Sequence, residues 1–155
     1  GPRWAGIAMA VTTIAAVTGR SLVAWLMPAG EDRRLVAAVS YGVQILGCLA
    51  FIASRGSDPA LIWLGVILVG LGVGNLVSLP PLIAQVEFVR EDVSRAVALM
   101  VAVGQAVYAF APALYGLVRQ WAPAGTHPGD APLVQAMTIA FFAAAIAVYL
   151  AGRRR

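Results

Sequence analysis

Five long apolar runs, separated by short polar stretches, dominate the pattern of hydrophobic and polar positions along the chain. They cover residues 5–27, 35–53, 60–86, 95–118 and 133–151. About 20 residues of α-helix are needed to cross a hydrocarbon core that is about 30 Å thick. Each run is close to that length or longer, so the pattern predicts five membrane-spanning helices.

The breaks between the runs are rich in Pro, Gly, Ser and charged residues, which are typical of loops. At Asp58-Pro59 an N-capping aspartate precedes a proline at the first helical position, which predicts a helix start. No run alternates with the period of two that membrane β-strands require. The predicted fold class is therefore all-α, a single polytopic transmembrane bundle of about five helices over residues 1–155.

The composition indicates that lipid is the main partner of this chain. Hydrophobic residues make up 61% of the sequence and charged residues 12%, and the mean hydropathy is +0.85. Soluble domains are about half apolar and about a quarter charged. The net charge of +4 does not indicate nucleic-acid binding, because the arginines stand between apolar runs and not on one basic face.

The residues that usually carry enzymatic chemistry are scarce. Cys48 is the only cysteine, so no intrachain disulfide can form, and its apolar surroundings predict a small buried hydrophobe. His127 is the only histidine and lies in a Pro/Gly-rich loop, so neither a histidine cluster nor a catalytic triad can be built. We therefore expect no enzymatic activity, no metal site and no cofactor.

The arginines fall mainly at one end of the predicted bundle. Three belong to the other end, namely Arg3, Arg55 and Arg119. The remaining eight are Arg20, Arg33, Arg34, Arg90, Arg95, Arg153, Arg154 and Arg155. Cytoplasmic loops carry the excess of basic residues. We therefore expect a protein of the bacterial plasma (inner) membrane with its C-terminus in the cytoplasm and its N-terminus outside.

Three motifs resemble a known transporter family. Gly19-Arg20 is followed by Asp32-Arg33-Arg34 in a short loop, similar to a glycine/aspartate/arginine loop motif. The third run is Gly-rich and ends in a proline pair, and the fourth combines small residues with one proline; they read LVGLGVGNLVSLPPLIAQ and VGQAVYAFAPALYG. Together these features resemble the C-terminal portion of a major facilitator superfamily transporter.

This resemblance carries expectations about fold and function. The five runs would stand for helices eight to twelve of twelve, which makes the chain a partial major-facilitator-type fold. Its partners would be the missing N-terminal helices and an unidentified small solute, moved across the membrane by alternating access around a site near the bilayer midplane. The first, third and fourth runs would line that site. The alternative is a non-transporting assembly or scaffold subunit that uses its glycine faces to bind partners.

Uncharged polar residues inside the apolar runs are the candidates for lining a substrate path, because polar groups in lipid usually face the bundle or a cavity. Asn75 lies in the third run, and Gln105 and Tyr108 are three residues apart in the fourth, so they share a helix face. Thr12 and Thr13 are candidates in the first run. The alternatives are links between helices and, for the threonines, bonds to their own helix.

Arg20 is the most unusual charge, because it lies inside an apolar run. It has several possible partners, namely Asp32, the connector carboxylates Glu87, Glu91 and Asp92, and the backbone carbonyls of a neighbouring helix. Any such contact, with Arg20 and Asp32 as the named pair, would form a conformational latch in a rocking transporter. The alternative is an arginine whose side chain extends to the membrane interface.

Glycine and proline positions indicate packing and bending. Gly70 and Gly74 form a G-x-x-x-G pattern, which permits close approach of two helix backbones. Pro80, Pro81 and Pro112 lie inside predicted helices, where proline removes a backbone hydrogen bond. We expect kinks there that would serve as hinges.

Overall fold

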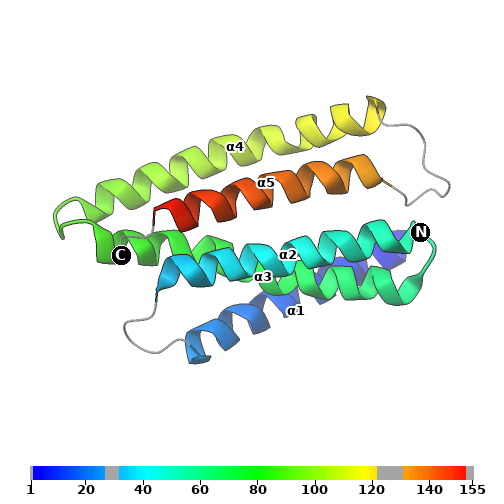
Figure 1. Cartoon of the computed structure of the whole chain (residues 1–155), viewed down its shortest axis with the longest axis horizontal. Helices are drawn as coiled ribbons and strands as arrows, with labels where there is room; N and C mark the ends of the chain where they lie inside the picture. Colours follow the sequence, from blue (N-terminus) through cyan, green and yellow to red (C-terminus); the bar gives the residue numbers. More distant parts are fainter. Residues whose placement is uncertain (1, 27–31, 122–130, 153–155) are drawn as a thin grey trace.

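The computed structural model describes residues 2–26, 32–121 and 131–152, and these residues form five helices with no strand among them. Successive helices run antiparallel in an elongated bundle (Figure 1). Their bounds are α1 Pro2–Leu26, α2 Arg33–Ser54, α3 Pro59–Glu87, α4 Val93–Trp121 and α5 Pro132–Ala151. The predicted all-α fold of five helices is confirmed, and described helix ends differ from the predicted runs by at most three residues. Met27, the loop with His127 and Arg153 to Arg155 lie outside the described residues.

All five helices are long and apolar enough to cross a membrane, which indicates an integral membrane protein. Tryptophans mark both ends of α1: Trp4 is 64% exposed and Trp25 is 82% exposed. They are 21 positions apart, which at about 1.5 Å per residue is about 32 Å. That separation matches the hydrocarbon thickness of about 30 Å, and tryptophan is enriched at both membrane interfaces.

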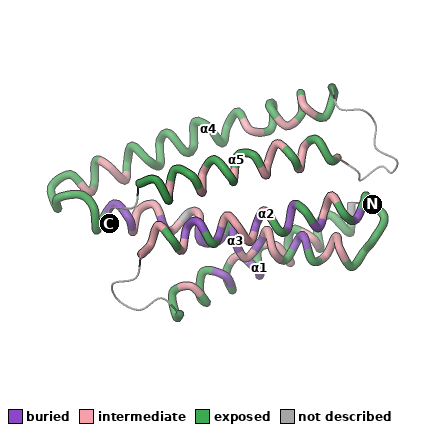
Figure 2. Tube along the Cα trace, viewed as in Figure 1, coloured by how far each residue is buried: buried purple, intermediate pink, exposed green. Residues whose placement is uncertain are grey.

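The buried core lies among α1, α2 and α3, whereas α4 and α5 contain no buried residue (Figure 2). Helix α3 contacts α1 on one side and α2 on another, and α5 packs mainly against α2. Besides small residues, the core contains Val66, Leu79 and Ile83 and the amide side chains of Gln44 and Asn75. The chain thus consists of a packed three-helix unit, with α5 lying along α2 and α4 attached most loosely.

Glycines allow the close approach of α3 to its two neighbours. A Cβ atom added at Gly70 would lie 2.7 Å from the Cβ of Ala15 in α1. One added at Gly74 would overlap the carbonyl group of Ala16, and one at Gly72 would lie 2.7 Å from the carbonyl oxygen of Ser40 in α2. Such distances are below ordinary van der Waals contact, so these helix backbones touch with no room for side chains.

Helix α5 is joined to α2 by aromatic contacts and to α4 by a hydrogen bond. Tyr41 of α2 contacts the rings of Phe142 and Tyr149 in α5, with centroid distances of 5.6 and 5.9 Å. Both distances fall in the range of stabilising aromatic pairs. The hydroxyls of Tyr115 and Thr138 lie 3.0 Å apart and connect α4 to α5. Helix α4 is therefore attached by a hydrogen bond and half-buried contacts, without a buried core of its own.

Candidate functional site

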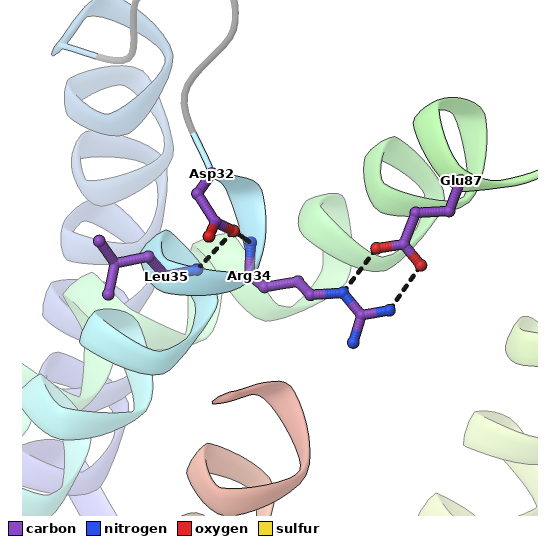
Figure 3. A network of polar contacts seen from close by, with 4 residues as sticks. All are labelled: Asp32, Arg34, Leu35 and Glu87. Carbon is purple, nitrogen blue, oxygen red and sulfur yellow. Dashed lines mark hydrogen bonds and ion pairs between the residues drawn. The ribbon is translucent and has the colours of Figure 1, made fainter. Parts of the chain in front are cut away.

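The predicted arginine-rich end of the bundle brings together the end of α1, the start of α2, the end of α3 and the start of α4 (Figure 1). Asp32 is the N-cap of α2, and its carboxylate accepts hydrogen bonds from the backbone N–H groups of Arg34 and Leu35 at 3.0 and 3.2 Å (Figure 3). Such a cap satisfies backbone donors that the first helical turn leaves open. It begins α2 at Arg33 and places Arg33 and Arg34 in its first turn.

Arg34 forms a two-pronged ion pair with Glu87 at the end of α3 (Figure 3). Its Nε and Nη2 atoms donate to Oε1 and Oε2, each at 2.5 Å. Paired bonds of this type hold both the distance and the orientation of the two side chains. A Cβ atom added at Gly152, after α5, would collide with the Arg34 guanidinium. Arg34 therefore stands where α2, α3 and the end of α5 meet.

Two other arginines reach backbone carbonyls of α3. The Nε of Arg20 donates to the carbonyl oxygen of Gly74 at 3.1 Å, and Arg33 donates to that of Leu82. These bonds flank Pro80 and Pro81, whose missing N–H groups interrupt the ladder of a helix that continues through both prolines. Arginines from α1 and α2 thus hold α3 on both sides of its weakest segment.

Arg20 therefore contacts a neighbouring helix carbonyl, which was one of the partners considered for it from the sequence. The carboxylate of Asp32 is engaged with the backbone of its own helix start. Both residues lie toward the same end of the bundle, and their action as a conformational latch stays a prediction.

The polar candidates of α1 and α3 form hydrogen bonds within their own helices. Thr12 donates to the carbonyl oxygen of Ala8 and Thr13 to that of Met9, both at 2.9 Å. The buried amide of Asn75 donates to the carbonyl oxygen of Leu71 at 3.4 Å. Intrahelical bonds of this kind satisfy a polar side chain in an apolar helix. Thr12 is half-buried where α1 meets Gly70, whereas Thr13 is exposed.

Gln105 and Tyr108 differ from these residues because their side chains form no hydrogen bond with any other described residue. Both are exposed on α4, Tyr108 by 74%. No hydrogen bond among the described residues connects them to Asn75, Thr12 or Thr13. The five substrate-lining candidates therefore divide into a group satisfied inside α1 and α3 and a pair that is exposed on α4. Pro112, one turn further along α4, lies within the continuous helix.

Two contacts were not predicted from the sequence. Arg34 and Glu87 were each recognised as charges near helix ends, but they are 53 positions apart and nothing local indicates their pairing. The bond between Tyr115 and Thr138 joins residues 23 positions apart. A pair of opposite charges at the ends of two consecutive antiparallel helices is the signal that would have indicated the first contact.

Among the described residues no three His, Cys, Asp or Glu side chains gather closely enough to hold a metal ion. No protein-family model matches this chain, and neither does any curated protein or solved structure.

Proposed function

We propose that this chain is part of a secondary transporter and supplies helices like the last five of a major facilitator. In this proposal it moves a small solute by alternating access, in a bacterial inner membrane, with its C-terminus in the cytoplasm. Its partners are the lipid bilayer, further transporter helices and the solute. The positions of the arginines support this orientation, because Arg20, Arg33, Arg34, Arg90 and Arg95 all belong to one end of the bundle.

The observation that carries the proposal is the polar pair on α4. The amide of Gln105 has two donors and an acceptor, and the hydroxyl of Tyr108 has one of each. Neither group has a hydrogen-bond partner among the described residues, although both lie near the middle of an apolar helix of 29 residues. Leaving such groups in hydrocarbon is costly, so they need water, a solute or another helix. A water-filled substrate path that is lined by further transporter helices supplies all three kinds of partner.

The alternative of a scaffold subunit depends on glycine faces that are free to bind partners. Gly70 and Gly74 lie against α1, and Gly65 and Gly72 lie against α2. These faces are thus occupied within the chain. A scaffold would have to use α4 instead, which makes the same helix decisive for both functions.

The test measures whether water reaches the polar face of α4. With Cys48→Ala as background, Gln105→Cys should react with a membrane-impermeant maleimide in vesicles. Val107→Cys should stay unlabelled. Val107 is also exposed in the chain, but it lies about 200° around the helix from Gln105, on the opposite face of α4, where lipid and not water would cover it. Absence of labelling at Gln105→Cys, with both variants normally folded, would show that this face is covered by lipid or protein and would contradict a substrate path along it.

A further inference from the structure

A cavity of about 300 Å³ lies at the end of the bundle opposite the clustered arginines. It is formed where α2 turns into α3 and where α5 begins. Its walls include Phe51, Ile52, Ser54, Ile62, Pro132 and Gln135. Small-molecule sites span about 300–1,000 Å³, so this cavity is suited to a segment of a molecule and not to a large one.

The walls are mainly apolar, and of the two polar side chains that line them, only Ser54 has hydrogen-bond partners among the residues that the structure describes. The buried Ser54 hydroxyl donates to the carbonyl oxygen of Phe51 at 2.7 Å and accepts from the N–H of Gly56 at 3.2 Å. It is therefore satisfied by its own turn. The half-exposed Gln135 side chain has no hydrogen bond to another described residue, so its amide is available to an occupant. The cavity thus combines an apolar volume with one amide.

The position of the cavity in the bilayer limits what can fill it. Gln135 is three residues inside α5, which is about 4.5 Å below the helix start. Ser54 is the last residue of α2, so the cavity lies at the boundary between hydrocarbon and headgroups. At that depth the molecules present at the highest concentration are lipids, and each ester-linked phospholipid combines a long apolar chain with carbonyl acceptors.

We infer that this cavity is a phospholipid site, in which part of an acyl chain contacts Phe51, Ile52 and Ile62 and an ester carbonyl accepts a hydrogen bond from the Gln135 amide. The site would fix one lipid against the junction of α2, α3 and α5. This inference depends on membrane insertion and not on transport, so it can fail or succeed independently of the proposed function.

The occupancy test fills the cavity and compares a matched site. Ala131 lines the cavity and is the N-cap of α5, where no side-chain hydrogen bond would be lost on substitution. Ala136 is exposed within α5 and does not line the cavity. Purified protein is titrated with dipalmitoyl phosphatidylcholine, and bound lipid is counted by native mass spectrometry. We expect one retained lipid in the wild type and in Ala136→Trp, and about tenfold weaker retention in Ala131→Trp, as for a loss of about 1.4 kcal/mol. Equal retention by all three would overturn the proposal.

A second variant tests the hydrogen bond and does not depend on tolerance of a bulky residue. The wild type should retain the ester-linked lipid several-fold better than its ether-linked analogue, which lacks the carbonyl oxygens. Gln135→Leu should remove that preference while circular dichroism and elution from size exclusion stay unchanged. Equal binding of the two lipids by the wild type would refute the assignment. Displacement of the lipid by decanoic acid at micromolar concentration would identify a water-borne amphiphile as the occupant and would equally refute it.

Discussion

The contact between α1 and α3 yields a quantitative prediction, because one glycine in it has a matched control elsewhere in the chain. A Cβ atom at Gly74 would lie 2.8 Å from the carbonyl carbon of Ala16 and 3.1 Å from its Cα, so the two backbones must separate. A Cβ atom at Gly42 in α2, within the same three-helix unit, would meet nothing within 4 Å. Replacing either glycine by alanine in a helix interior gains about 1 kcal/mol of helix propensity. Only Gly74→Ala adds overpacking, which typically costs about 1–3 kcal/mol.

The propensity gain is common to both variants and cancels when they are compared. Gly74→Ala should therefore be about 1–3 kcal/mol less stable than Gly42→Ala. At about 2–4 °C per kcal/mol for a chain of this size, the apparent Tm values should differ by about 2 to 12 °C. The Gly74 carbonyl also accepts from Arg20 and from the Ser78 hydroxyl, so separation of the helices weakens a polar contact as well.

The assay can use the only thiol of the protein as its reporter. Cys48 is 2% exposed in α2, and a maleimide dye that fluoresces on reaction will label it only when the three-helix unit opens. Heating both variants in the same detergent with this dye gives the two apparent Tm values directly. Equal values would refute the interpretation that α1 and α3 touch backbone to backbone at this position.

Three further outcomes are expected from single contacts. Arg34→Glu should destabilise the protein, and adding Glu87→Arg should restore its stability. The coupling free energy of this half-exposed pair should be about 0.2–1 kcal/mol and should decrease in high salt. A double-mutant cycle of denaturation curves at two salt concentrations measures it, and zero coupling would mean that the pair does not hold α2 to α3. Tyr115→Phe should cost about 0.6 kcal/mol, the average for interhelical hydrogen bonds in membranes, and no further loss should occur when Thr138→Val is added. If the proposed transporter function holds, Asn75→Ala in the full-length protein should lower solute uptake at an unchanged membrane level, and unchanged uptake would exclude Asn75 from the substrate path.

The helices could be predicted from the sequence because their signals are local. Runs of apolar residues determine each span, and the Asp58-Pro59 pair predicted the start of α3. In the structure the Asp58 carboxylate accepts from the N–H groups of Ala60 and Leu61 at 2.9 and 3.3 Å, and Pro59 is the first helical residue. These interactions involve residues within three positions of one another, so no tertiary information is needed to infer them.

The tertiary contacts could be predicted only in part. The G-x-x-x-G pattern at Gly70 and Gly74 indicates a close helix neighbour, but it does not say that α1 is that neighbour while α2 lies against Gly72. The partner of Glu87 depends on the axial alignment of α2 and α3, which is set by the glycine contacts along both helices. The sequence therefore identified the residue types of the candidate site, while their pairing depends on packing across the whole bundle.

The uneven packing of the helices implies an order of unfolding. Helices α1 to α3 share buried residues, glycine contacts and arginine bonds to α3 carbonyls, whereas α4 has no buried residue. Regions with few buried contacts open at lower free energy than the core. In detergent titrated with sodium dodecyl sulfate, amides of residues 93–121 should lose hydrogen-exchange protection before those of residues 59–87. Helix propensity alone predicts the opposite order, because the two segments are equally long but residues 59–87 contain two interior prolines and residues 93–121 only one. Simultaneous loss of protection would show that α4 belongs to the same cooperative unit as α3, and would require stabilising contacts beyond the bond between Tyr115 and Thr138.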